Sequence, residues 1–153
     1  MLKDDLYMSY GSNCYGARML ARCPGARLFS TAVLRDYRLV ERLYADIEEA
    51  PGNAVYGVLW RITDEDRHRL DQCEGVAKGI YTRGTFCVQC GQRFYRVFTY
   101  VMTSETRCQR DGIPYPEEYR RICSAGVRQH GLPDAFEKSA WVINLPAARR
   151  VVK

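Results

Sequence analysis

Residues 6–13 are Leu6-Tyr7-Met8-Ser9-Tyr10-Gly11-Ser12-Asn13, an apolar run that ends abruptly in a glycine and two small polar residues. The run predicts a short buried strand that stops at Gly11. The successive backbone N–H groups of the following turn could face an anion, such as a carboxylate or a developing oxyanion. The alternative is an ordinary strand-to-helix turn in which Ser12 or Asn13 caps the next helix.

Glu74 supplies a second candidate group. Thr63 can cap a helix that starts after it, with Asp66 in the capping-box position, and Gly75 is a typical residue at which such a helix ends. Glu74 then lies at the helix C-terminus, where the helix dipole disfavours an anion and raises the carboxyl pKa. Partial burial would raise this pKa further, toward the near-neutral value that suits a general base. The alternative is an exposed helix-end glutamate without a chemical role.

The order of predicted elements indicates the fold class. Strands are expected at residues 27–34, 37–44 and 55–62, an acidic loop at 46–53, and a hairpin of strands 81–90 and 94–102 around Gly91. Helical turns are expected at 15–21, a second helix at about 116–130, and a short third helix that begins at Pro133. This order is not a regular βαβ alternation, so a mixed α+β fold with a largely antiparallel, curved or barrel-like sheet fits better. Residues 1–153 are expected to form a single domain because no repeat or long linker divides them.

Composition and charge exclude several classes of function. The formal charge of +5 is spread along the 153 residues, and its densest spots, Arg120-Arg121 and Arg149-Arg150, lack a nucleic-acid-binding motif. No segment approaches the roughly 20 apolar residues that a membrane-spanning helix needs. Residues 1–5 lack the apolar core of a signal peptide, which predicts a cytoplasmic protein.

The seven cysteines are expected to be reduced thiols. Cys87-Val88-Gln89-Cys90-Gly91 has the spacing of half a zinc knuckle, but a closed site needs four ligands and the chain has no second such pair. The only histidines, His68 and His130, are isolated. The preferred interpretation is a hairpin turn that carries two thiols, with no metal site, and a zinc-knuckle interaction module remains an alternative.

Taken in order, these segments resemble the γ-glutamylcyclotransferase family over nearly the whole chain. Residues 6–13 are similar to its tyrosine-glycine-serine-asparagine signature, residues 55–60 to its central strand, and residues 70–76 with Gly79 and Tyr81 to the segment that carries its catalytic glutamate. Later matches are Tyr100-Val101-Met102, Pro116-Glu117-Glu118-Tyr119, Gly126 and His130-Gly131-Leu132-Pro133.

The resemblance implies a small α+β fold around a largely antiparallel β-barrel flanked by a few helices. It implies an enzyme that needs no cofactor or metal and cleaves a small γ-glutamyl amide with release of 5-oxoproline. Glu74 would transfer the proton, which makes residues 7–13 and the Glu74 carboxylate two halves of one active site. The implied substrate-binding residues are Tyr7, Met8, Ser9, Tyr10, Gly11, Ser12 and Tyr119, with Asn13, Tyr81 and Tyr100 near the pocket. Neither a nucleic acid nor a membrane partner is implied, and the protein would be a monomer or a homodimer.

Two features depart from the family pattern. Cys14 stands where the signature usually has an aliphatic residue, and its thiol either lines the pocket or packs in the core. The chain ends soon after residues 141–144, so the leaving-group side of the pocket could be bounded differently. The amine released could come from a dipeptide, a γ-glutamyl-amine, glutathione or a γ-glutamyl-capped biosynthetic intermediate. A binding module without catalysis is a further alternative.

Overall fold

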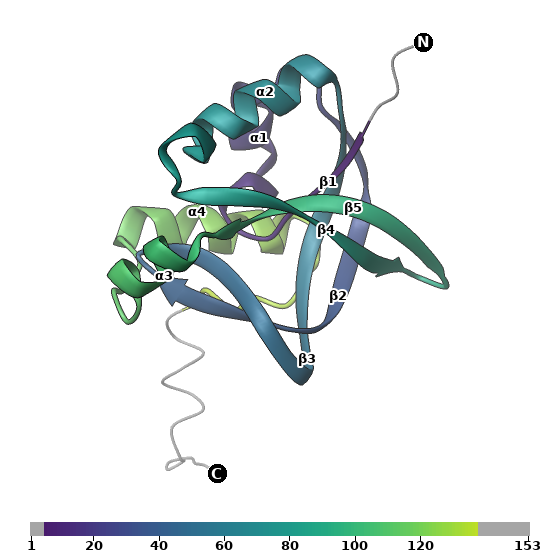
Figure 1. Cartoon of the computed structure of the whole chain (residues 1–153). Helices are drawn as coiled ribbons and strands as arrows, with labels where there is room; N and C mark the ends of the chain where they lie inside the picture. The colour runs from purple at the N-terminus through teal and green to yellow at the C-terminus, as the bar shows by residue number, and fades with distance from the viewer. Residues whose placement is uncertain (1–4, 138–153) are drawn as a thin grey trace.

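The computed structural model describes residues 5–137, and five strands of this region form a closed barrel (Figure 1). The strands are β1 (Asp5–Ser9), β2 (Arg27–Arg42), β3 (Tyr44–Ile62), β4 (Tyr81–Cys90) and β5 (Arg93–Met102). Their order around the barrel is β1-β3-β2-β4-β5. Neighbouring strands are antiparallel except where β1 meets β5, in a parallel pairing of Tyr7 with Phe98. The predicted α+β barrel is therefore confirmed.

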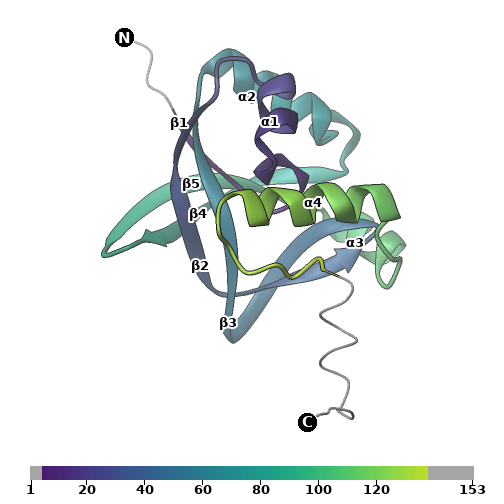
Figure 2. The ribbon, with the colours of Figure 1, turned by 180° about the vertical axis from the view of Figure 1, so that it is seen from behind.

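Within residues 5–137, four α-helices and two short 3-10 turns surround the barrel: η1 (Ser12–Cys14), α1 (Gly16–Arg22), α2 (Asp64–Cys73), η2 (Val76–Lys78), α3 (Ser104–Arg110) and α4 (Glu117–Gln129). Helices α1 and α2 lie together near one end of the barrel, and α4 runs past η1 (Figure 2). The predicted cap of α2 is confirmed, because the Asp66 N–H donates to Thr63 Oγ1 at 3.1 Å. None of the helices within residues 5–137 is long and apolar enough to cross a membrane.

The predicted loop at residues 46–53 is wrong, since this segment belongs to the long strand β3. It pairs with β2 in a register that places Asp46 opposite Val40 and Glu49 opposite Tyr37. The acidic composition suggested a solvated loop, but Asp46 and Glu48 form ion pairs with Arg42. The strands predicted separately at 27–34 and 37–44 are likewise one strand as far as Arg42, with a bend at Asp36 (φ +67°). The chain turns at Leu43, and Tyr44 begins β3.

Two helix predictions also need correction. Helix α3 was not predicted, although Thr103 caps it by accepting from the Thr106 N–H at 3.3 Å, a signal of the same kind as at Thr63. The helix expected after Pro133 does not begin there, because the described residues up to 137 form a turn in which the Phe136 N–H donates to Asp134 Oδ1. Residues 141–144 lie outside the described part of the chain.

Cys87 and Cys90 both lie in β4, rather than in the hairpin turn, which is formed by Gly91 (φ +61°) and Gln92. Side chains of an extended strand alternate between its faces, so residues three apart point in opposite directions and do not chelate one ion together. All seven cysteines are free thiols. Within residues 5–137 no group of three or more potential metal ligands gathers at one point.

Two glycines allow the close approaches that position the N-terminal turn. A Cβ atom on Gly57 of β3 would lie 2.2 Å from the Ser9 carbonyl oxygen of β1. A Cβ atom on Gly126 of α4 would lie 2.5 Å from the Tyr15 backbone nitrogen. Both distances are far below van der Waals contact, so these positions admit only glycine without a shift of the backbone. The turn at η1 is thereby held between the barrel and α4.

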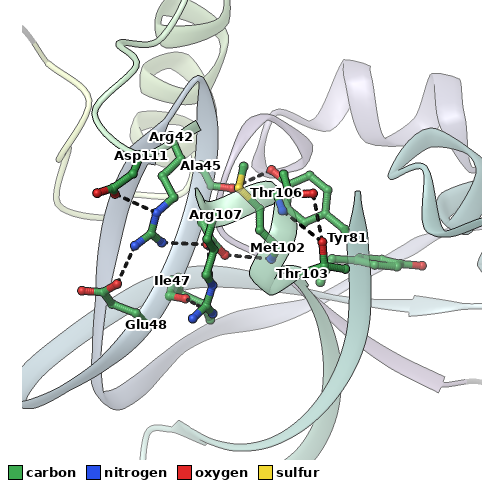
Figure 3. A network of polar contacts seen from close by, with 12 residues as sticks. Arg42, Ala45, Ile47, Glu48, Tyr81, Met102, Thr103, Thr106, Arg107 and Asp111 are labelled. Atoms are coloured by element: carbon green, nitrogen blue, oxygen red, sulfur yellow. Dashed lines mark hydrogen bonds and ion pairs between the residues drawn. The ribbon is translucent and has the colours of Figure 1, made fainter. Parts of the chain in front are cut away.

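A buried ionic network fixes the end of the β2–β3 hairpin (Figure 3). Asp46 is completely buried, and its carboxylate accepts from the Met102 N–H at 3.0 Å and from Arg42 at 2.8 Å. Arg107 of α3 approaches the same carboxylate at 3.3 Å and donates to the Ile47 carbonyl. The network therefore ties β3 to β5 and α3 directly beside Ala45.

Candidate active site

The N-terminal turn, the end of α2, the strands β1, β3, β4 and β5, and helix α4 contribute to the lining of a cavity of about 40 Å³. Its lining includes Glu74 and most of the predicted site residues, and in full comprises Tyr7, Tyr10, Gly11, Ser12, Asn13, Ala45, Glu74, Tyr81, Thr99, Tyr100 and Tyr119. The structure thus brings the two separate sequence segments to one place. Ala45 and Thr99 were not predicted, because a small side chain and a lone threonine within strands carry no chemical signal in the sequence.

A larger outer cavity of about 260 Å³ shares Ser12, Glu74, Tyr81 and Tyr119 with the inner one and opens beside α1. Arg18 and Arg22 of α1 line it, together with Tyr44 and Cys73. The outer cavity therefore has two arginines beside Glu74, whereas the inner one has Glu74 and five tyrosines. The two arginines were not predicted, although their spacing of four residues places them on one face of a helix that follows the signature turn.

Gly11 is required by space rather than by backbone conformation. Its φ is −117°, outside the left-handed region that favours glycine. A Cβ atom at this position would lie 2.8 Å from the Tyr119 hydroxyl oxygen. Any side chain here would displace Tyr119 or fill the cavity.

The turn after Gly11 has the form of an anion-binding site. The Cys14 and Tyr15 N–H groups donate within the turn, to Gly11 O and Ser12 O at 3.1 Å. Among residues 5–137, the N–H groups of Gly11, Ser12 and Asn13 have no hydrogen-bond acceptor. Unpaired N–H groups at the wall of a cavity are suited to a carboxylate or an oxyanion.

Glu74 caps the C-terminus of α2, and its side chain is 17% exposed. Burial raises the pKa of its carboxyl group to about 7, while the positive charges of Arg22 and Arg18 act in the opposite direction. The expected direction of the shift is therefore found, but its main cause is burial rather than the helix dipole. A carboxyl group with this pKa exchanges protons readily near neutral pH.

Arg22 connects the two halves of the site. Its guanidinium donates to Asn13 Oδ1 at 3.0 Å and lies 4.0 Å from Glu74 Oε2. Because the Asn13 oxygen is held by Arg22, the amide nitrogen of Asn13 points the other way and donates to the Tyr7 hydroxyl at 3.1 Å. The turn and the carboxylate are thus held in a fixed relation by one side chain.

The overall arrangement matches a known family, since the family model for gamma-glutamyl cyclotransferase, AIG2-like proteins covers residues 7–129. The chain belongs to this family. A γ-glutamylcyclotransferase from Bos taurus is 31% identical over 147 residues, which span 87% of this chain and 75% of the relative. Its Homo sapiens counterpart is 29% identical, over 90% of this chain and 78% of the relative.

Solved structures agree with the family assignment. A γ-glutamyl cyclotransferase matches with a TM-score of 0.73 at 27% identity, over 86% of this chain and 82% of that protein. An uncharacterized Homo sapiens protein matches with a TM-score of 0.78 at 25% identity, over 98% and 92% of the two chains. The chain therefore has the fold of the γ-glutamyl cyclotransferase family, whose name indicates a small γ-glutamyl compound as ligand.

Met8 and Ser9, expected from the family signature to bind substrate, do not line either cavity that contains Glu74. Met8 is completely buried in the core. Ser9 accepts from the Trp60 indole N–H at 3.1 Å and donates to the Val58 carbonyl, so it anchors the start of the turn to β3. Cys14 packs in the same way: it is buried, contacts the Ser9 carbonyl at 3.3 Å, and burial raises its thiol pKa to about 12.

Proposed function

We propose that this chain cleaves γ-glutamyl amides by intramolecular cyclisation, with release of 5-oxoproline and a free amine, and that Glu74 transfers the proton. The observation that carries the proposal is the cavity that Glu74 lines together with Gly11, Ser12 and Asn13, whose backbone N–H groups have no acceptor within residues 5–137. Burial there raises the pKa of Glu74 to about 7. A base and an oxyanion-binding wall that face one small cavity are the two elements that this reaction requires.

The reaction needs no nucleophile from the enzyme. The α-amine of the glutamyl group attacks its own γ-carbonyl carbon, a C–N bond forms to close a five-membered ring, and the original amide C–N bond breaks. Glu74 accepts a proton from the α-ammonium group and later donates it to the leaving nitrogen, so the proton count balances. Proton transfer by a positioned group typically contributes about 10²–10⁴-fold to the rate. Holding the glutamyl chain folded contributes further, because the reacting atoms are kept at short distance.

The charge that develops on the γ-carbonyl oxygen requires donors in fixed positions. The N–H groups of Gly11, Ser12 and Asn13 are candidates, since they have no acceptor in the described chain and border the cavity. Donors that are already in place need no reorganisation when the charge appears, which is why such groups lower the barrier effectively.

The outer cavity favours a leaving group that carries a carboxylate. Arg18 forms no hydrogen bond or ion pair with any residue between 5 and 137, and it lines this cavity next to Arg22. A guanidinium that has no partner is suited to bind a carboxylate. Among the alternatives open from the sequence, a γ-glutamyl amino acid or peptide therefore fits better than a γ-glutamyl-amine.

We expect faster release of 5-oxoproline from γ-glutamylalanine than from γ-glutamylethylamide, which differs only by lacking the carboxylate. The expected difference in kcat/KM is about tenfold or more, because a charge-assisted hydrogen bond contributes roughly 1.5–3 kcal/mol. The measurement is a chromatographic assay of 5-oxoproline over a panel that also includes glutathione. Binding of these compounds without any turnover would instead establish a non-catalytic binding module.

The pH dependence should reflect Glu74. Because the base must be deprotonated, kcat/KM is expected to rise with pH around a midpoint near 7. Arg18 lowers the pKa of Glu74 by its charge alone, so Arg18→Met should move the midpoint to higher pH. Arg121→Met, at an exposed position of α4, is the matched control and should leave the midpoint in place. A profile that is flat between pH 5.5 and 8.5 would contradict the assignment of Glu74 as the base.

A further inference from the structure

Five tyrosines line the inner cavity: Tyr7, Tyr10, Tyr81, Tyr100 and Tyr119. A phenolic hydroxyl has one proton to donate and two lone pairs that accept. Where the protein already uses the proton, the hydroxyl offers only an acceptor to a ligand. Where a protein N–H already donates to the oxygen, the proton remains available. The internal hydrogen bonds of the five groups therefore show which end of a ligand each one can bind.

The backbone of Ala45 forms hydrogen bonds with two of these hydroxyl groups, as an acceptor for one and as a donor to the other. The Tyr81 hydroxyl donates to the Ala45 carbonyl oxygen at 2.8 Å, because a carbonyl can only accept (Figure 3). The Ala45 N–H donates to the Tyr119 hydroxyl oxygen at 3.1 Å, because an amide N–H can only donate. Tyr81 thus presents an acceptor to the cavity, and Tyr119 keeps a proton to donate.

The other three tyrosines follow the same logic. Tyr10 donates to the Tyr100 carbonyl at 2.5 Å, and Tyr100 donates to Asp71 at 2.6 Å, so both protons are used. Tyr7 accepts from the Asn13 amide, whose orientation is fixed by Arg22, so its proton remains available. Among the five tyrosines, Tyr7 and Tyr119 are therefore the two whose hydroxyl protons remain available.

The donors adjoin the N-terminal turn. The Tyr119 hydroxyl oxygen lies close to Gly11, only 2.8 Å from the position that a Cβ atom on this residue would take. It is therefore next to the unpaired N–H groups of the turn. The Cys123 thiol also interacts with Tyr119, but sulfur is a weak acceptor and does not compete with a carboxylate for the proton.

The buried carboxylate next to Ala45 keeps this arrangement in place. Asp46 is bound through one oxygen to the Met102 N–H and through the other to Arg42, so the chain at Ala45 is held between β2 and β5. The Ala45 N–H and C=O belong to two successive peptide groups, so a shift of the chain at Ala45 would disturb the hydrogen bonds to both tyrosines. The donor and acceptor roles of Tyr119 and Tyr81 are thus properties of the folded chain rather than of a ligand.

We propose that the backbone N–H and C=O of Ala45 give the cavity a polarity, by which we mean an acceptor at one tyrosine and a donor at another. Tyr81 accepts from the α-ammonium group of the ligand, and Tyr119 donates to an anionic oxygen of the ligand beside the Gly11 turn. The inference rests on the proposed function, since it assumes a γ-glutamyl group as ligand. It adds which tyrosine recognises which end of that group. With the α-ammonium group bound at the Tyr81 hydroxyl, Glu74, which lines the same cavity, is the group that removes its proton.

The test compares three unreactive probes by calorimetry: glutamate, glutarate, which lacks the α-amine, and 4-aminobutyrate, which lacks the α-carboxylate. Wild type is expected to bind glutamate at least tenfold more tightly than glutarate. Tyr81→Phe should remove most of that difference while glutarate affinity stays within about twofold. Tyr119→Phe should weaken glutamate and glutarate alike, by about tenfold, as expected for the loss of a hydrogen bond to a charged group. Tyr56→Phe, at an exposed position of β3, is the control and should change none of these affinities.

The outcomes separate the polarity from the proposed function. If wild type binds glutamate and glutarate equally, or if Tyr81→Phe weakens both equally, the polarity is overturned while γ-glutamyl recognition stands. If wild type releases no 5-oxoproline from γ-glutamylalanine, the proposed function fails and the polarity fails with it. If it releases 5-oxoproline but binds none of the three probes, only the polarity is overturned. Thermal unfolding of each variant shows whether it is folded, and the wild-type comparison of glutamate with glutarate tests the polarity independently of any variant.

Discussion

Replacing Glu74 with glutamine is expected to lower the rate of 5-oxoproline release by about 10²–10⁴-fold, because the amide cannot accept the proton of the α-ammonium group. The measurement is kcat for γ-glutamylalanine at pH 8, where the wild-type carboxyl is ionised. Glu65→Gln, at an exposed position of the same helix, is the matched control and should retain wild-type activity. If Glu74→Gln retained activity within tenfold of wild type, another group would have to be the base.

The same substitution should not damage the fold, and its effect on stability has a defined sign. The Glu74 pKa is raised in the folded protein to about 7, so the protonated carboxyl favours folding at low pH and this contribution is lost as the pH rises through 7. Above that pH the buried charge costs stability. Glutamine carries no charge, so Glu74→Gln should raise the free energy of unfolding at pH 8 by up to about 3 kcal/mol. Loss of activity together with gain of stability would mark a functional rather than a structural carboxylate.

Much of the fold follows from local patterns in the sequence. The cap at Thr63 and the hairpin at Gly91 were predicted correctly because each depends on a few adjacent residues. The first half of β3 was taken for a loop because its carboxylates are neutralised by arginines of other segments, which local composition does not reveal. Long-range pairing of charges, rather than propensity, makes this segment a strand.

The candidate site likewise has residues that local sequence patterns or family resemblance predict and residues that only the folded structure brings in. Glu74 and the turn after Tyr10 were predicted from their chemistry and from family resemblance, and Tyr119 from resemblance alone; the structure brings all three to the lining of one cavity. Ala45, Arg18 and Arg22 were not found, since a single alanine or a helix-surface arginine has no distinguishing pattern. Their importance arises only when β3 and α1 are brought against Glu74. Met8 and Ser9 illustrate the converse, because a residue within a signature can serve packing while its neighbours face the cavity.

Asp46→Ala should destabilise the protein strongly, by about 3–5 kcal/mol. It removes the completely buried carboxylate that pairs with the buried guanidinium of Arg42, and it also removes the acceptor of the Met102 N–H. The measurement is the free energy of unfolding from denaturant titration at pH 7. Asp111→Ala is the matched control: it removes another carboxylate from the same Arg42, but this one is 69% exposed, so a loss below about 1 kcal/mol is expected. Equal effects of the two substitutions would mean that the network contributes no more than a surface ion pair. A large effect of Asp46→Ala alone would instead identify the network as the support of the Ala45 peptide, and through it of the two tyrosines that face the cavity.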